Sequence, residues 1–392
     1  MESLRIALFT YSTKPRGGVA HTLSLAEGLA CLKNQVHVYA LSTEGGFFRP
    51  VSVPFTLIPC PRADYKNIDE KIEDYIRIYS EYLASMKESY DIYHAEDCIS
   101  ANALLNLRNS GLIKFFVRTV HHIDDFTSKS LVECQLRSIL KPDYLIVVSE
   151  FWERELRSRY SLNPVVINNG VNIKKFNIRE VEEPKEKAKE NFSVNGCKVM
   201  LSIGGIEPRK NTLTALRAFS IANSYFKAKG ERLVWLIGGG ETLFDYKAYR
   251  EEFFSEIKKL RLKLDEDIVI LGSVPEGSIA ELYRAGNVFV FPSVKEGWGL
   301  VVLEAMASGL PVVASGIEPM TDYLKDGENA LLVSPMDYES LAQQIIRVLE
   351  ESEVRDRLTR NAIKTAKAYS WRNTALRHLE VYRGILEGVI PT

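Results

Sequence analysis

Short apolar runs alternate with helical patterns along the first half of the chain. Apolar residues recur at helical spacing between the runs, as at Leu25, Leu29 and Leu32. The strand candidates are Arg5 to Thr10, Val36 to Leu41, Asp91 to Ala95, Lys114 to Val120, Tyr144 to Val148 and Pro164 to Asn168. Strand and helix in regular alternation predict a doubly wound α/β domain with a parallel sheet.

The same alternation restarts after a charge-rich stretch, residues 180–191. The second set of strand candidates is Val199 to Gly204, Leu233 to Gly238, Ile268 to Gly272, Val288 to Phe291, Pro311 to Ala314 and Ala330 to Val333. We therefore predict two doubly wound domains joined by a linker between Asn168 and Glu183. The predicted boundaries are 1–172 with 373–392 for the first domain and 173–372 for the second.

Two segments depart from this alternation. Gly45 to Pro61 contains four prolines and reads as a loop with an edge strand, near the place of a second substrate. The last helical stretch is expected to bury one face, formed by Trp371, Leu376, Leu379, Tyr382 and Leu386.

Length and composition narrow the class of protein. A chain of 392 residues is too long for one hydrophobic core. A net charge of -1 gives no indication of a nucleic-acid partner. Five scattered cysteines without a C-x-x-C pair suggest reduced thiols in a cytoplasmic protein. No signal peptide is recognised and no apolar run reaches the ~18 residues of a membrane span, so only peripheral membrane contact stays open.

The stretch from Phe291 to Gly309 carries the clearest chemistry. A buried strand ends at Pro292, and a helix is predicted from Leu300 to Ala307, so Glu296 lies in the turn between them. Glycines in this turn allow close approach of a ligand, and unpaired N–H groups at the helix start attract anions. Glu304, one turn into the helix, could face the same ligand. A carboxylate pair beside an anion site suits a polyhydroxylated ligand that carries phosphate; the alternative is a surface turn with an unrelated helical glutamate.

Other candidates follow other predicted strands. Arg209 and Lys210 come just after a strand end, where they could neutralise a leaving phosphate; alternatively they are solvated cations. Gly17 and Gly18 form a glycine pair in the first loop, where they could approach a ligand; the alternative is a turn without a functional role. His121 follows a strand directly and is a site candidate or a packed histidine. The adjacent I-D-D-F lacks D-x-D spacing, so no metal is predicted.

The segment E-G-W-G-L-V-V-L-E-A-M-A-S-G-L-P-V-V-A-S resembles the E-x7-E signature of retaining GT-B glycosyltransferases of the fourth family. The resemblance covers nearly the whole chain. It implies a GT-B fold of two facing Rossmann-like domains, with the site in the cleft between them and a C-terminal helix that crosses back to the first domain.

The resemblance also implies roles for the candidate residues. Glu296 would contact hydroxyls of the donor sugar and Glu304 the ribose. Backbone groups around the sugar and phosphate would come from Gly297, Trp298, Gly299 and Leu300. Gly17 and Gly18 would lie near the diphosphate and acceptor, and His121 near the transferred sugar.

Two positions depart from the family pattern: Trp298 stands where phenylalanine is usual, and the second departure concerns Gly205. The loop after the first strand of the second domain usually reads G-R-x-x-x-x-K, with both cations on the diphosphate. Lys210 matches the lysine, but Gly205 stands where the arginine is usual. Arg209 is the candidate for the missing charge.

These implications together predict a cytoplasmic, retaining, metal-independent glycosyltransferase with no cofactor. The donor would be a nucleotide diphosphate sugar of UDP, GDP or ADP type, and the acceptor a small molecule, lipid or glycan. In a front-face mechanism the leaving phosphate oxygen would take the acceptor proton. The alternatives are an epimerase or phosphorylase on the same fold, or a nucleotide-sugar-binding protein without turnover, which Gly205 keeps open.

Overall fold

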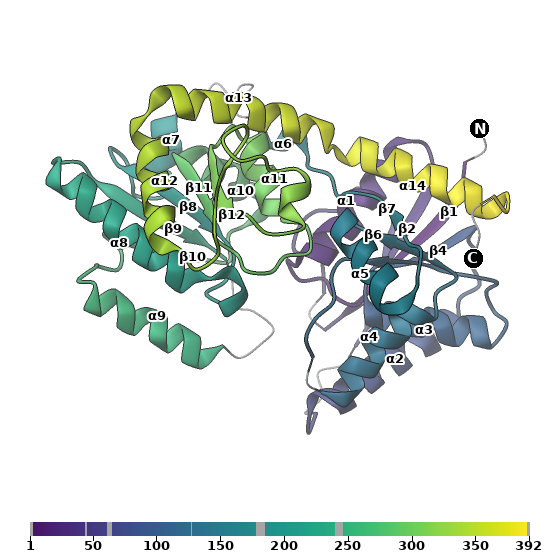
Figure 1. Ribbon diagram of the computed structural model, residues 1–392. Coiled ribbons are helices and arrows are strands. Elements are labelled where there is room, and N and C mark those ends of the chain that lie inside the picture. Colours follow the sequence, from purple (N-terminus) through teal and green to yellow (C-terminus); the bar gives the residue numbers. More distant parts are fainter. Residues whose placement is uncertain are drawn as a thin grey trace. The chain divides into compact units, whose positions relative to one another are not determined.

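The computed structural model describes residues 3–43, 45–60, 65–126, 128–177, 185–239 and 246–389. The chain divides into two compact units: Met1–Gly170 with Trp371–Thr392 is unit 1, and Val171–Ser370 is unit 2. Each unit is built on its own parallel sheet (Figure 1). Part of the predicted linker, residues 178–183, lies outside the described residues.

Within the described residues, unit 1 contains a seven-stranded sheet in the order β3-β2-β1-β4-β5-β6-β7. The strands are β1 (Arg5–Thr10), β2 (Gln35–Ser42), β3 (Phe55–Pro59), β4 (Ile92–Ala95), β5 (Val117–Val120), β6 (Tyr144–Val147) and β7 (Val165–Val166). The helices are α1 (Gly17–Cys31), α2 (Ile68–Ala84), α3 (Cys98–Asn109), α4 (Lys129–Leu140), α5 (Glu150–Tyr160) and α14 (Trp371–Leu386). The strand order reverses between β1 and β4, whose connections run to opposite sides.

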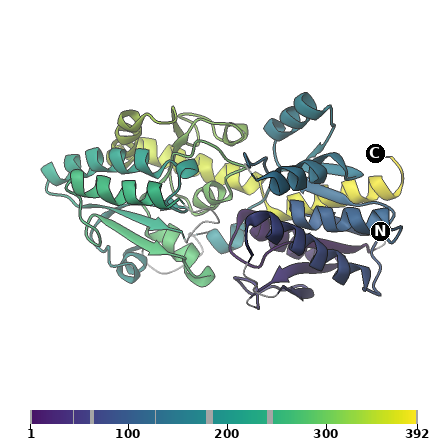
Figure 2. The same ribbon diagram turned by 90° about the horizontal axis from the view of Figure 1, so that it is seen from below.

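Both faces of β1 are buried, which explains its unbroken apolar run. Ala7 and Phe9 pack with α2, α3 and α4, whereas Ile6 and Leu8 pack with α1 and α14. Helices therefore cover both faces of this sheet (Figure 1 and Figure 2). The edge strand β3 lies inside the proline-bearing segment, as predicted.

Within the described residues, unit 2 contains a six-stranded sheet in the order β10-β9-β8-β11-β12-β13. The strands are β8 (Lys198–Ile203), β9 (Leu233–Gly238), β10 (Ile268–Gly272), β11 (Val288–Phe291), β12 (Val312–Ser315) and β13 (Leu331–Val333). The helices are α6 (Ile173–Phe176), α7 (Lys185–Asn191), α8 (Thr212–Ala228), α9 (Lys247–Lys259), α10 (Ile279–Ala285), α11 (Leu300–Ala307), α12 (Tyr338–Glu350) and α13 (Ser352–Ala368). The order reverses between β8 and β11.

The structure confirms the two parallel-sheet Rossmann-like folds and places the last helix in unit 1. Three predicted details are wrong. β7 spans only Val165–Val166 of the predicted Pro164 to Asn168. β5 begins at Val117 rather than Lys114, because the N–H of Phe116 donates to the carboxylate of Asp143 (3.0 Å). On α14, Leu376 and Leu386 are exposed.

The buried stripe of α14 is rotated relative to the prediction. It runs through Ala375, His378, Leu379, Tyr382 and Ile385, so a histidine occupies a core position. No helix in the described part of the chain combines the length and apolar character that a membrane span requires.

Candidate functional site

The predicted residues of unit 2 lie where the strand order reverses. β8 and β11 are hydrogen-bonded neighbours, and both send their connections from the same edge of the sheet. The connection after β8 passes through a 3-10 turn, η2 (Pro208–Lys210), and the connection after β11 leads into α11. In open α/β sheets, ligands bind at the carboxyl ends of strands flanking such a reversal.

Both cations of the β8 connection contact the carboxylate of the β11 connection. Lys210 Nζ lies 2.7 Å from Glu296 Oε1, and an Arg209 guanidinium nitrogen lies 3.0 Å from the same oxygen. Arg209 also pairs with Glu207 at 3.0 Å. The structure thus brings Glu296 to Lys210, which lies 86 positions earlier in the sequence, and to the adjacent Arg209.

Two hydrogen bonds link the connection after β8 to the connection after β11. The N–H of Val294 donates to the carbonyl of Arg209 (2.9 Å), and the side-chain amide of Asn211 donates to the carbonyl of Pro292 (3.1 Å). The Lys210 ammonium also lies 4.4 Å from the centre of the Phe291 ring. Lys210 is therefore held by the Phe291 ring of β11 as well as by the carboxylate of Glu296.

Burial and charge oppose each other in this ion pair. Burial lowers the pKa of Lys210, and Glu296 only partly offsets that effect. Burial raises the pKa of Glu296, but the nearby Lys210 and Arg209 outweigh it, so the net pKa lies below the ordinary value. Glu296 is therefore an ionised carboxylate shared by two cations.

The turn before α11 depends on its glycines. Gly299 precedes the helix with φ +88°, in the left-handed region that favours glycine. Tyr323 donates its hydroxyl to the carbonyl of Trp298 (3.0 Å), and Trp298 itself is buried against the rings of Tyr323 and Tyr369. Gly297 is partly exposed, and Leu300 begins the helix as predicted.

Replacing Gly299 by alanine is expected to destabilise unit 2. A Cβ there would lie 2.9 Å from the Tyr323 hydroxyl, and the left-handed backbone adds strain, so we expect a loss of about 1–3 kcal/mol in the free energy of unfolding. Gly277→Ala is the matched control because its Cβ would meet open space. Urea unfolding checks the difference; equal midpoints for the two variants would refute this account of the turn.

Glu304 lies on α11 one turn after Leu300 and accepts a hydrogen bond from the Tyr283 hydroxyl (2.7 Å). Burial raises the pKa of Glu304 to about 7, against smaller lowering effects from Tyr283 and Lys175. Lys175 pairs instead with Glu276 at 2.5 Å. Glu304 is therefore close to half protonated at neutral pH.

The glycines at the ends of β8 and β9 serve close packing. A Cβ on Gly239 would lie 2.4 Å from the carbonyl oxygen of Gly204. The backbone of Gly204 in turn passes the stem of Lys210, which a Cβ would meet at 3.1–3.3 Å. Close backbone contact thus explains why these positions are glycine.

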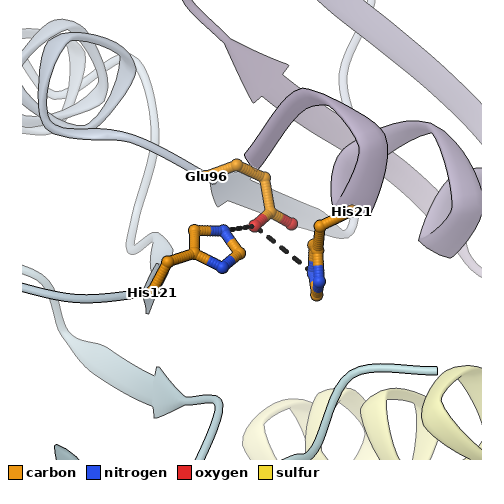
Figure 3. Close-up of side chains that lie close together, drawn as sticks. All are labelled: His21, Glu96 and His121. Carbon is orange, nitrogen blue, oxygen red and sulfur yellow. Dashed lines mark hydrogen bonds and ion pairs between the residues drawn. The ribbon is translucent and has the colours of Figure 1, made fainter. Parts of the chain in front are cut away.

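In unit 1 the first loop and the loop after β5 meet. Gly17 and Gly18 begin α1, and a Cβ on Gly18 would lie 3.9 Å from the His121 ring. His121 Nε2 is hydrogen-bonded to Glu96 Oε2 (3.1 Å), and His21 Nε2 lies 3.5 Å from the same oxygen (Figure 3). These atoms lie within 4.8 Å of one another, a spacing that a metal could use, but a proton on Glu96, whose pKa burial raises, satisfies the same contacts.

Sequence reasoning missed Glu96, and a histidine near the start of a helix, such as His21, is more often structural than functional. Glu96 directly follows β4, which neighbours β1 at the reversal of the sheet, and that position was the available signal. His21 is fully buried on α1 and bonded through Nδ1 to Asn169 Oδ1 (2.9 Å). The I-D-D-F segment after His121 lies apart from this cluster in its contacts. Its Asp124 pairs with His122 at 3.1 Å near the surface.

Comparison with known proteins connects both units to one activity class. Residues 183–365 match the family described as glycosyl transferases group 1, and residues 15–175 match the one described as glycosyltransferase family 4. The chain is a glycosyltransferase that combines these two domains. These matches confirm the glycosyltransferase and GT-B parts of the prediction; the E-x7-E subgroup and retention of anomeric configuration stay predictions.

Some relatives of this glycosyltransferase match over nearly their whole length. An uncharacterised glycosyltransferase of Methanocaldococcus jannaschii is 27% identical over 98% of this chain and 99% of its own. A D-inositol 3-phosphate glycosyltransferase of Corynebacterium urealyticum is 24% identical over 97% and 96%.

Solved structures of similar fold include sucrose-phosphate synthase of Thermosynechococcus elongatus, with a TM-score of 0.79 at 22% identity over 98% of this chain and 99% of the other. HepE of Anabaena, solved with UDP and glucose, has a TM-score of 0.76 at 18% identity over 96% and 99%. These likenesses establish the fold.

Proposed function

We propose that this glycosyltransferase moves a sugar from a nucleotide diphosphate sugar to an acceptor with retention of configuration and without a metal at the donor site. The observation that carries the proposal is the cluster of Lys210 and Arg209 around buried Glu296, at the carboxyl ends of β8 and β11. Two cations beside the start of α11 suit a diphosphate.

The proposed roles follow from charge. As the sugar leaves, negative charge grows on the β-phosphate, and Lys210 and Arg209 stabilise it. Glu296 keeps both cations charged in a buried place and offers its carboxylate to hydroxyls of the sugar. Glu304, with Tyr283 fixing one oxygen, offers the other to the ribose hydroxyls.

The relatives support a nucleotide donor and leave its base open. HepE has been solved with UDP and with UDP-glucose, and the catalytic domain of starch synthase IV from Arabidopsis thaliana with ADP and acarbose. For this chain we propose a donor of UDP, GDP or ADP type and an acceptor that is a small molecule, lipid or glycan.

Arg209 also bears on the alternative of binding without turnover. Gly205 removes the arginine expected in the family, yet the Arg209 guanidinium reaches Glu296 beside Lys210. Because the positive charge is supplied from another position of the same loop, we favour catalysis. His121 would lie near the sugar, and the departing phosphate oxygen would accept the acceptor proton.

The test is to incubate the protein with nucleotide sugars and candidate acceptors, with and without EDTA, and to measure nucleoside diphosphate release and the anomeric configuration of the product. The proposal predicts turnover that EDTA leaves unchanged and a product with the donor's configuration. Binding without any release would favour the non-enzymatic alternative, and inverted configuration would overturn the mechanism.

Donor affinity is expected to fall on acidification through pH 7. The pKa of Glu304 is raised to about 7 from an ordinary 4.5, so the folded protein holds a proton that the unfolded chain has lost between these values. The raised pKa therefore stabilises the folded state fully below pH 4.5, and this stabilisation is lost as the pH rises through 7. If the ribose needs the ionised carboxylate, affinity should be about tenfold weaker at pH 6 than at pH 8.

Calorimetry with an intact nucleotide sugar checks this, because its diphosphate is esterified at both ends and does not titrate in that range. The control is Glu304→Gln, which should bind weakly with no such pH dependence. A wild-type affinity that stays constant between pH 6 and pH 8 would contradict the ribose assignment.

A further inference from the structure

A hollow of about 340 Å³ in unit 2 lies away from the proposed donor residues. It is lined by the segments that lead into β11 and β12, residues 286–287 and 309–311, together with parts of α7, α10 and α13. Because β11 and β12 are parallel neighbours, their amino ends share one edge of the sheet, opposite the edge where the connection to Glu296 begins. The volume lies within the ~300–1,000 Å³ of small-molecule sites.

The lining of this hollow is rich in positive charge. Lys185 comes from α7, Arg284 from α10 and Arg355 from α13. Asp356 is the one carboxylate among the described lining residues. Arg284 also lies 4.0 Å from Glu281 on its own helix. Three cations beside one carboxylate suit an anion that carries two negative charges.

Two of these cations contact backbone carbonyls rather than carboxylates. Lys185 donates its ammonium to the carbonyl of Gly286. The guanidinium of Arg355 donates to the carbonyls of Val348 and Leu349, at 3.4 Å each. Neither cation pairs with a carboxylate in the part of the chain that the structure describes. Their charge is therefore left for a ligand to balance.

Repulsion between cations favours an anion at this place. The pKa of Lys185 is lowered to about 8, first by burial and then by repulsion from Lys189; Glu186 opposes this effect and Arg355 adds to it. Lys185 and Arg355 thus repel each other beside the hollow. An anion bound to both would relieve that repulsion and favour the charged lysine.

Ser308 supplies an observation that does not depend on charge. It lines the hollow at the end of α11 and is 1% exposed, and its hydroxyl has no hydrogen-bond partner among the described residues. Buried hydroxyls normally have a partner, and a hydroxyl can donate to a phosphate oxygen. We propose that this hollow binds a phosphate group, as the free ion or as the phosphomonoester of a small metabolite, through Lys185, Arg355 and Ser308.

This site goes beyond the proposed transfer reaction, whose charges come from the opposite edge of the same sheet. Phosphate binding here and sugar transfer can therefore succeed or fail independently.

The test titrates full-length protein by calorimetry with inorganic phosphate and, separately, with glycerol 3-phosphate. Lys210→Met protein is titrated in parallel, because the proposed donor site also attracts phosphate. We expect one equivalent to bind in the hollow with a Kd in the millimolar range or tighter, and Lys210→Met to keep this binding. Tighter binding of glycerol 3-phosphate than of phosphate would assign the site to a phosphomonoester, and the reverse order would assign it to the free ion.

Three variants of the hollow locate the binding. Lys185→Gln and Arg355→Gln keep a donor for the neighbouring carbonyls but remove the charge, so each should weaken binding by about 10- to 100-fold. Ser308→Ala should weaken binding by about 2- to 10-fold without lowering the melting temperature, because its hydroxyl has no partner to lose in the described structure.

Arg357→Gln is the matched control. It makes the same change of charge on α13, but Arg357 donates to the carbonyl of Gly327 (3.1 Å) and is not part of the lining. Its affinity for phosphate should equal that of wild type. Wild-type protein that binds neither probe below about 10 mM would overturn the proposal. Binding that is lost in Lys210→Met but kept in Arg355→Gln, or lost equally in Arg357→Gln, would overturn it as well.

Discussion

Replacing Glu296 by glutamine is expected to lower the turnover number for sugar transfer by about 100- to 1,000-fold. The substitution keeps the volume of the side chain but removes the charge shared by Lys210 and Arg209. Lys210 would then be a buried cation without its nearest counter-ion, and its already lowered pKa would fall further, so less positive charge would meet the leaving phosphate. Steady-state release of nucleoside diphosphate measures the effect.

The control for this variant is Glu207→Gln, which removes the other carboxylate that pairs with Arg209, at 3.0 Å. The turnover number of Glu207→Gln should be within about tenfold of wild type, because Lys210 keeps Glu296 as its partner.

A turnover number of Glu296→Gln within a few fold of wild type, with the fold intact, would contradict a role for Glu296 in the site.

Lys210→Met is the second large prediction. Methionine preserves the stem that packs against Gly204 and removes the ammonium that lies 2.7 Å from Glu296. We expect a loss of about 100- to 1,000-fold in the turnover number, because the lysine is the more enclosed cation, with 16% of its side chain exposed against 42% for Arg209.

Arg209→Met is the comparison that tests whether Arg209 replaces the arginine missing at Gly205. Its effect should be smaller than that of Lys210→Met but clear, and the double variant should lose less than the sum of the two free-energy changes, because both cations share one carboxylate. An unaltered turnover number for Lys210→Met would shift the role to Arg209, and unaltered turnover in both variants would contradict the diphosphate assignment.

Local pattern was enough to predict most of the fold. β9, β10 and β11 occupy the predicted residues, since buried parallel strands carry continuous apolar runs that end at glycine or proline. The face of α14 was predicted only in part, because its buried stripe includes His378, which a count of apolar residues leaves out. The start of β5 depends on a hydrogen bond to Asp143, 27 residues away, which no local pattern reveals.

Only part of the candidate site could be predicted from the sequence. Glu296, Glu304 and Lys210 could be named because they lie at fixed spacing around predicted strand ends. The pairing of Arg209 with Glu296, and the convergence of His21, Glu96 and His121, depend on contacts between distant elements. The bond between His21 and Asn169 spans 148 positions, so the chemistry of that cluster is set by topology rather than by spacing.

The most direct test of a donor site at Lys210, Arg209 and Glu296 is a thermal-shift panel. Wild-type and Lys210→Met protein are heated with UDP, GDP, ADP and their sugars, each with and without EDTA. A ligand that binds only the folded state stabilises it, by about 2.7 kcal/mol at a concentration of 100 times its Kd. This stabilisation raises the melting temperature. We expect one nucleotide class to raise the wild-type melting temperature equally with and without EDTA, and to have a smaller effect on Lys210→Met. No shift with any nucleotide, or an equal shift in both proteins, would contradict the account.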